Sequence, residues 1–270
     1  MSVDVRSDSF DPSRCATLIE LLESRAALHP DKVVFTFLPD GEDKGIIVTY
    51  GELSQRAKAI ANRFREFTKV GDRALMLFPS GLEFIFAFFG SLYAGLIAVP
   101  AYPPRRNQNL NRLKSIIDDC DPSLVLTTSK VMTVAEPLFA ETPGLQALMW
   151  QTVDMDEPSS ADGWQEPPIN RDTLAFLQYT SGSTGNPKGM MVSHGNLIYN
   201  EAMISVGFRS NDQDVSVSWL PMFHDMGLIG TTLQPLYCGA TSVFMSPASF
   251  LQKPMRWLQA ISDYRGTAIC

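Results

Sequence analysis

Short apolar runs alternate with helix-length amphipathic segments along this chain of 270 residues. The first runs lie at 73–78 (RALMLF), 96–99 (LIAV) and 123–128 (SLVLTT). Runs of this length, bounded by turn residues, are typical of buried strands, and helices between them are typical of parallel pairing. The alternation therefore predicts an α/β fold made of layered, mostly parallel sheets with helices on both faces.

Helix signals lie in the intervals between these runs. Thr49 and Glu52 have the spacing of a capping box, and apolar residues recur at helical spacing after them. The predicted buried positions are Leu53, Ala57, Ile60, Ala61 and Phe64 in this helix, and Leu113, Ile116, Ile117 and Cys120 in a later one. Each helix would therefore have one apolar face with which to cover a sheet.

The most apolar stretch, at 82–102 (LEFIFAFFGSLYAGLIAVPAY), is about long enough to span a bilayer. However, Ser80 and Glu83 have capping-box spacing, and Gly95 lies where a glycine ends a helix. The helix between these signals is too short to cross a membrane. We therefore predict no membrane span, with an anchored membrane protein as the less favoured alternative.

Residues 154–172 interrupt the alternation with a segment rich in proline, serine and acidic residues, which is typical of a surface connection. The alternation then resumes with apolar runs at 174–179, 189–193, 215–220 and 241–245 and helices at 196–203 and 254–264. We predict a first α/β lobe over 1–153, a connection over 154–172 and a second part over 173–270. The last residues (GTAIC) begin like a buried strand, which indicates a domain truncated at its C-terminal end.

The chain has 22 basic and 29 acidic residues, a net charge of −7 and a pI of about 5.0. Proteins that bind duplexes usually carry a basic stripe, and since the sequence has none, we predict no nucleic-acid partner. An anionic ligand would need local positive charge or backbone donors.

The cysteines, Cys15, Cys120, Cys238 and Cys270, are far apart and have no histidine at metal-ligand spacing. This spacing is typical of reduced thiols in a reducing compartment. The N-terminal residues are polar and acidic, without the layout of a signal peptide. These features predict a cytoplasmic protein.

Residues 180–189 (TSGSTGNPKG) place three glycines, four hydroxyl residues and one lysine directly after an apolar run. Ligands of open α/β sheets bind at this carboxyl edge, where consecutive N–H groups can surround an anion. The segment is not a Walker loop, because Pro187 precedes Lys188 and Gly189 follows it. The residue types leave two alternatives, a phosphate-binding loop and a flexible surface turn.

A second polar cluster lies at 219–230 (WLPMFHDMGLIG), also after an apolar run and therefore at the same edge. His224 and Asp225 are adjacent within an otherwise apolar stretch. A lone histidine in such a stretch is more often a hydrogen-bonded core residue than a catalytic one. Both interpretations remain open from the residues alone.

The segment 179–189 (YTSGSTGNPKG) resembles the phosphate-loop signature of the adenylate-forming, or acyl-activating, AMP-binding enzymes. This superfamily includes acyl-CoA synthetases, luciferases and nonribosomal amino-acid-activating domains. The segments WLPMFHDMGL and GSLYAGLIAVPAYPPRR are most similar to the fatty acyl-AMP ligases. The resemblance begins near Leu18 and implies the truncated large N-terminal domain of such an enzyme.

The resemblance implies ATP-dependent activation of a medium- or long-chain fatty acid to an acyl-adenylate, with release of pyrophosphate and transfer to an acyl carrier protein. The implied catalytic residues are Lys188 and His224. The implied ATP ligands are Thr180, Ser181, Gly182, Ser183, Thr184, Gly185 and Lys188, and Thr184 would also bind Mg²⁺. The implied acyl pocket consists of His224, Asp225, Met226 and Gly227. The neighbouring Trp219, Met222 and Phe223 would either wall this pocket or pack in the core.

Members of this family are considerably longer than the present chain. They carry a later acidic residue for magnesium, an aspartate for the ribose hydroxyls and a C-terminal domain with a catalytic lysine. The resemblance therefore implies that residues 1–270 by themselves do not catalyse the reaction. The alternatives are the N-terminal region of a long-chain acyl-CoA synthetase and a non-catalytic nucleotide-binding fragment.

Overall fold

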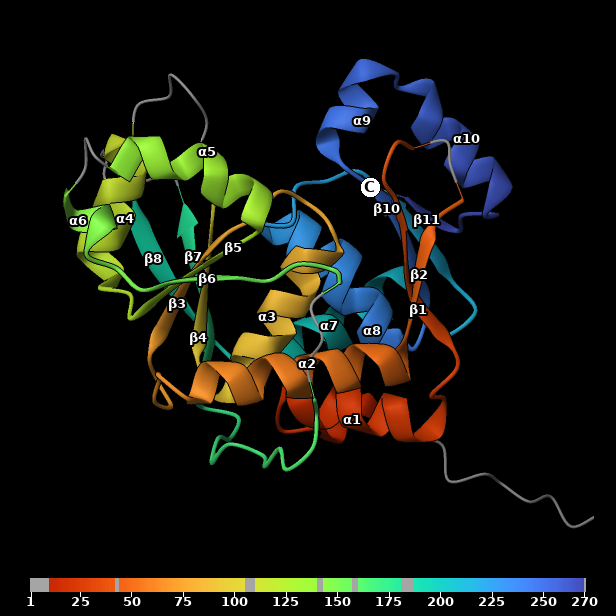
Figure 1. The fold of residues 1–270 in the computed structure, drawn as a ribbon. Helices are drawn as coiled ribbons and strands as arrows, with labels where there is room; N and C mark the ends of the chain where they lie inside the picture. Colours follow the sequence, from red (N-terminus) through yellow and green to blue (C-terminus); the bar gives the residue numbers. More distant parts are fainter. Residues whose placement is uncertain are drawn as a thin grey trace, which may run out of the picture.

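The computed structural model describes residues 10–41, 44–104, 110–139, 143–156, 160–180 and 187–269. Its strands form a six-stranded and a five-stranded sheet, with helices between the sheets and on their outer sides (Figure 1). Seven strand pairs are parallel, and the two antiparallel strands, β2 and β8, each lie at the edge of a sheet. The predicted layered α/β fold with mostly parallel sheets is therefore confirmed.

The six-stranded sheet has the strand order β6-β5-β3-β4-β7-β8. Its strands are β3 (Arg73–Leu77), β4 (Ile97–Ala101), β5 (Leu124–Thr127), β6 (Trp150–Thr152), β7 (Leu174–Thr180) and β8 (Lys188–Ser193). The helices between them in the chain are α3 (Leu82–Ala94), α4 (Asn111–Cys120), α5 (Ser129–Phe139) and α6 (Pro143–Gln146). As predicted, α3 joins β3 to β4 and α4 joins β4 to β5, whereas β6 and the helices α5 and α6 were not predicted from the sequence.

The five-stranded sheet has the order β11-β9-β10-β1-β2. Its strands are β1 (Val33–Leu38), β2 (Ile46–Thr49), β9 (Val215–Ser218), β10 (Thr241–Met245) and β11 (Ala268–Ile269). The remaining helices are η1 (Pro12–Arg14), α1 (Leu18–Leu28), α2 (Tyr50–Arg65), α7 (His194–Phe208), the π-helix η2 (Met226–Leu233), α8 (Gln234–Cys238), α9 (Pro247–Gln252) and α10 (Met255–Asp263).

The predicted boundaries of the two lobes, at 153 and 173, are not boundaries between the two sheets. β1 pairs in parallel with β10, and β4 pairs in parallel with β7, so each sheet contains strands from both sides of the 154–172 segment. That segment lies along α2 and α3, where the side chain of Asn62 donates to Ser160 O and Asp162 O and Trp164 Nε1 donates to Tyr93 O. Its composition indicated a surface connection, but composition does not determine which strands pair across it.

Three cores lie between these layers. The largest lies between the sheets and includes α3, whose Phe84, Phe86, Phe88 and Phe89 are almost completely buried. Because strand side chains alternate between faces, Leu75 and Leu77 of β3 point away from this core and pack with α4 in the second one. The third core joins the outer face of the five-stranded sheet to α10. The central strands are thus covered on both faces, whereas the edge strands β2, β8 and β11 have exposed side chains.

The local helix signals are confirmed at two of three positions. Thr49 and Glu52 form both bonds of the capping box of α2, and Gly95 ends α3 in the left-handed conformation, with φ of 79°. The prediction that Ser80 caps α3 is wrong: Gly81 occupies the N-cap, and the Ser80 hydroxyl accepts a hydrogen bond from Met222 N at 3.2 Å. Within the described residues, no helix combines the length and apolarity needed to span a membrane.

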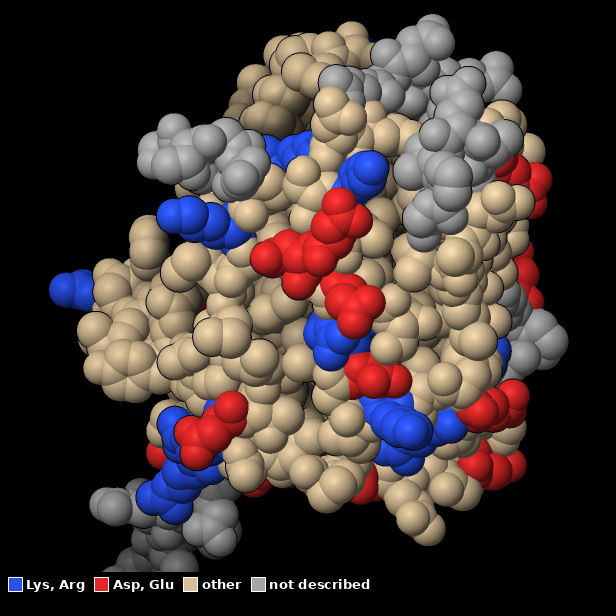
Figure 2. All heavy atoms as spheres, turned by 90° about the vertical axis from the view of Figure 1, so that its left-hand side faces the viewer, with Lys and Arg blue, Asp and Glu red and all other residues tan. Residues whose placement is uncertain are grey.

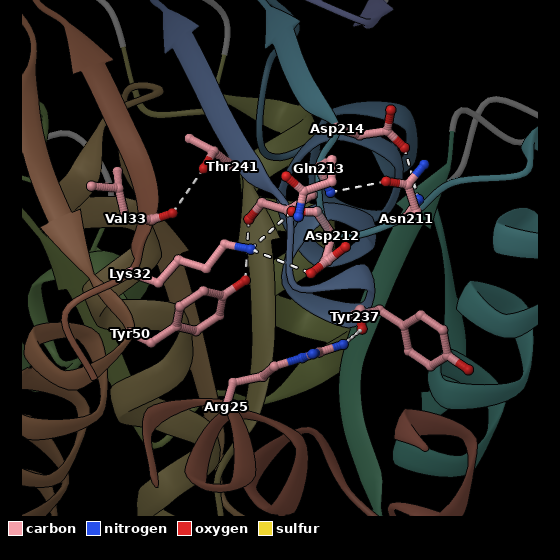
Figure 3. Close-up of polar contacts among 11 residues, drawn as sticks. Arg25, Lys32, Val33, Tyr50, Asn211, Asp212, Gln213, Asp214, Tyr237 and Thr241 are labelled. Atoms are coloured by element: carbon pink, nitrogen blue, oxygen red, sulfur yellow. Dashed lines mark hydrogen bonds and ion pairs between the residues drawn. The ribbon is translucent and has the colours of Figure 1, made fainter. Parts of the chain in front are cut away.

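Polar contacts join the amino edge of the five-stranded sheet to α1 and α2 (Figure 3). Tyr50 donates to Ala240 O at 3.1 Å, and Lys32 Nζ donates to Asp212 O at 2.8 Å. The Arg25 guanidinium also donates to Tyr237 O. These contacts lie at the edge opposite to the one at which residues 219–230 follow β9.

Candidate functional site

A cavity of about 420 Å³ lies at the carboxyl ends of β4 and β7. Its wall consists of residues 100–102, Arg112 and Ile116 of α4, residues 178–180, and residues 223–225. The volume is within the range of small-molecule pockets, about 300–1,000 Å³. The fold thus brings Thr180 of the first predicted polar cluster to the same cavity as His224 and Asp225 of the second.

The two ends of the predicted phosphate loop lie opposite each other, and one of them lines this cavity. Thr180 is the last residue of β7, Lys188 is the first of β8, and the two are partners in the antiparallel register. Thr180 lines the cavity, and both residues are exposed. The predicted ligands between them, Ser181, Gly182, Ser183, Thr184 and Gly185, lie outside the described residues.

Tyr179 lies immediately before the loop, and its side chain is buried. Its hydroxyl donates to Asp119 Oδ2 of α4 at 2.5 Å. Burial and this hydrogen bond both raise the pKa of Tyr179 above its ordinary value. The phenol therefore stays protonated and remains a hydrogen-bond donor at neutral pH.

The segment that carries His224 is held by a side-chain hydrogen bond from β7 and by a backbone hydrogen bond within the segment. Gln178 Nε2 donates to Phe223 O at 3.1 Å, and His224 N donates to Pro221 O at 3.1 Å. The His224 side chain is exposed and lines the cavity. The interpretation of His224 as a core histidine is therefore wrong, because the turn directs its ring to the cavity instead of the interior.

The other residues of the predicted acyl pocket occupy different places. Asp225 lines the cavity, and its carboxylate accepts from Met226 N at 2.8 Å as the N-cap of η2. The Met226 side chain is 60% exposed and does not line this cavity. Gly227 is buried, and a Cβ atom there would lie 2.1 Å from Pro221 O. Its role is therefore to allow the close approach of the backbone.

The aromatic and methionine residues near His224 also differ in their surroundings. Trp219 stacks on Phe250 with ring centroids 4.0 Å apart, and Met222 is buried in the central core. Phe223, by contrast, lines the cavity. Core packing thus accounts for Trp219 and Met222.

A second cavity, of about 550 Å³, lies on the other side of Tyr102, Phe223 and His224, which line both cavities. The rings of Tyr102 and Phe223 meet edge to face, with centroids 4.7 Å apart. Residues of α5 and residues 246–248 are among the other residues that line the second cavity. The Tyr102–Phe223 pair therefore separates the two cavities, and His224 is accessible from both.

Two polar residues of the first cavity were not predicted from the sequence. Arg112 lies one helical turn before Ile116 and thus on the same face of α4. Gln178 Oε1 is buried without a hydrogen-bond partner among the described residues. An unpaired buried acceptor is unfavourable by about 1–3 kcal/mol.

The surface charge does not by itself favour an anionic ligand. On the side of the molecule where α4 and α6 lie, Figure 2 shows basic and acidic side chains interspersed over the described residues. The described residues also contain no group of three histidine, cysteine, aspartate or glutamate side chains that could hold a metal ion. An anionic ligand would therefore have to be bound by hydrogen-bond donors or positive charge at the cavity itself.

Comparison with known proteins gives consistent matches. The model of the AMP-binding enzyme family matches residues 22–270. The medium-chain-fatty-acid–[acyl-carrier-protein] ligase JamA of Moorena producens is 41% identical over 256 residues, which are 93% of this chain and 43% of that protein. The long-chain-fatty-acid–AMP ligase FadD32 of Mycolicibacterium smegmatis is 35% identical over 255 residues, 93% of this chain and 40% of that protein.

Among solved structures, a fatty acyl-adenylate ligase from L. pneumophila, in complex with acyl adenylate and pyrophosphate, is 41% identical and superimposes with a TM-score of 0.87. The match covers 96% of this chain and 44% of that one. The chain therefore spans less than half the length of each of these three relatives.

Proposed function

Since this chain belongs to the family of AMP-binding enzymes, we propose that it is the N-terminal part of a fatty acyl-AMP ligase. The enzyme would activate a medium- or long-chain fatty acid with ATP and pass the acyl group to an acyl carrier protein. The observation that carries this proposal is the shared cavity, in whose wall Thr180 of the phosphate-loop segment and His224 lie together. Two similar proteins are named as ligases of fatty acids, and this supports the proposal.

The proposed reaction needs positioning and charge stabilisation more than covalent chemistry by the protein. A carboxylate oxygen of the fatty acid would attack the α-phosphorus, and the bond from that phosphorus to the pyrophosphate oxygen would break. Lys188 and the loop from Thr180 would hold the leaving phosphates, and His224 would lie beside the reacting groups. Mg²⁺ bound with Thr184 would neutralise phosphate charge.

The acyl chain would lie along the α4 side of the first cavity. Ala101 and Ile116 there are apolar, and both also line a smaller adjoining pocket of about 50 Å³ with Leu113. This wall is the apolar continuation of the site beyond His224. It is therefore the part of the cavity that suits methylene groups.

We expect Ile116→Phe in the full-length enzyme to shift substrate preference toward shorter acids, because the larger ring would occupy the apolar end of the cavity. The ratio of kcat/KM for dodecanoate to that for hexanoate should fall by about tenfold, roughly the discrimination for one or two methylene groups. Ile117→Phe, at a buried position of α4 outside the cavity wall, is the matched control for overpacking. An unchanged ratio in a folded Ile116→Phe variant would contradict this placement of the chain.

The proposed activity is tested by product analysis with the full-length enzyme, ATP and dodecanoate. We expect acyl-adenylate to accumulate, to be trapped by hydroxylamine and to disappear when a phosphopantetheinylated acyl carrier protein is added. With coenzyme A instead, we expect no acyl-CoA. Efficient formation of the coenzyme A thioester would identify an acyl-CoA synthetase, and the absence of any activated acyl group would favour a non-catalytic nucleotide-binding protein.

A cytoplasmic location is part of the proposal. Cys15, Cys120 and Cys238 are free. Unpaired cysteines are usual in a reducing compartment, where ATP and acyl carrier proteins are also available.

A further inference from the structure

Tyr179 contacts both strands that carry the predicted phosphate loop. It lies in β7 and is the register partner of Gly189 in β8, one residue before the Thr180–Lys188 pair. Its ring covers Gly189 so closely that a Cβ atom there would lie 2.9 Å from the ring carbon Cζ. The ring of Tyr179 therefore sets how the strands approach each other at the base of the loop.

The Tyr179 hydroxyl extends this contact to α4. It donates to Asp119 Oδ2 at 2.5 Å, across sixty residues of sequence. Asp119 lies three residues after Ile116 on α4, so the two are neighbours on one side of that helix. Because Ile116 lines the first cavity, the hydrogen bond joins the base of the loop to the helix that forms the cavity wall.

We propose that Tyr179 and Asp119 form a positioning pair, which holds the two ends of the phosphate loop at the spacing needed to bind the phosphates of ATP and ties that spacing to α4. The pair does not contact the reacting atoms. It acts through Thr180, Lys188 and the loop between them. This inference rests on the proposed function, because it assumes that the loop binds ATP.

The test measures ATP binding by calorimetry and pyrophosphate exchange with dodecanoate, both in the full-length enzyme. Tyr179→Phe keeps the ring over Gly189 and removes only the hydroxyl. We expect it to weaken ATP binding by about five- to tenfold, less than the full effect of a hydrogen bond to a charged group, because the pair acts on ATP only through the ends of the loop. The KM for ATP should rise accordingly, with a smaller change in kcat.

Variants of Asp119 test whether ATP binding depends on the Tyr179–Asp119 hydrogen bond and not on either side chain by itself. Asp119→Ala should weaken ATP binding as Tyr179→Phe does, and the double variant should be no weaker than either, because the two changes remove the same interaction. Asp119→Asn keeps an oxygen that accepts the hydrogen bond and should bind ATP almost as the wild type does. Additive effects of the two single changes would overturn the pairing.

Tyr93→Phe is the matched control. The Tyr93 hydroxyl donates to Glu23 Oε1 at 2.8 Å, and its side chain is fully buried away from both cavities. The Tyr93→Phe substitution should lower the melting temperature of the enzyme without changing its affinity for ATP. Equal weakening of ATP binding by Tyr93→Phe and Tyr179→Phe, or wild-type affinity in Tyr179→Phe, would overturn the inference. Wild-type enzyme that binds ATP but supports no exchange with any fatty acid would instead overturn the proposed function.

Discussion

Lys188→Ala in the full-length enzyme should lower the rate of pyrophosphate exchange by about tenfold or more, a loss of about 1.4 kcal/mol of transition-state stabilisation. Lys188 begins β8 opposite Thr180, and its exposed ammonium group lies at the end of the predicted phosphate loop. A positive charge there would stabilise the negative charge that develops on the departing pyrophosphate. The measurement is exchange of labelled pyrophosphate into ATP in the presence of dodecanoate.

Lys114→Ala is the matched control for this experiment. Lys114 is also exposed but lies on α4 and lines neither of the two large cavities, so its loss should leave exchange unchanged. Melting temperatures of both variants would show that each is folded. Wild-type exchange by a folded Lys188→Ala variant would exclude Lys188 as a phosphate ligand.

Gly227→Ala should both destabilise the protein and abolish most of its activity. A methyl group at this position would lie 2.1 Å from Pro221 O, a backbone atom that cannot rotate away. The turn of residues 221–227 would have to open, and His224 would move with it. We expect the free energy of unfolding to fall by about 1–3 kcal/mol, the usual cost of overpacking, and exchange to fall by more than the unfolded fraction explains.

Gly230→Ala provides the comparison within the same π-helix. A Cβ atom at Gly230 would meet no other atom within 4 Å, so the substitution should change neither stability nor exchange appreciably. Denaturant unfolding followed by circular dichroism would give the stabilities of both variants. Equal stability of the two alanine variants would show that the contact between Gly227 and Pro221 does not constrain the turn.

The site could be predicted from the sequence only in part. The loop at 180–189 was recognisable because its glycines, hydroxyl residues and lysine are consecutive, and their place after a strand puts them at the carboxyl edge of a sheet. Arg112 and Gln178 were not recognisable, because a single polar residue on a helix or strand is ordinary. They become parts of a site only when α4 and β7 pack around the same cavity.

Some features of the fold were determined by neighbouring residues and could therefore be read from the sequence alone. The capping box of Thr49 and Glu52, the left-handed Gly95 and the apolar face of α4 each depend on residues within a few positions of one another. Such local preferences act in any context in which a helix forms there. The alternation of these helices with apolar runs was sufficient to establish the fold class.

Only the tertiary structure decided which distant segments meet. Ser80 has the spacing of a helix cap, yet its hydroxyl binds Met222 N, more than a hundred residues away. β1 pairs with β10 across the 154–172 segment, and Tyr179 reaches Asp119 on another element. These contacts depend on how apolar faces pack in three dimensions, and that packing is a property of all the layers together. Nearby residues along the chain determine local preferences. The packing of the assembled core determines which distant segment a strand or a hydroxyl contacts.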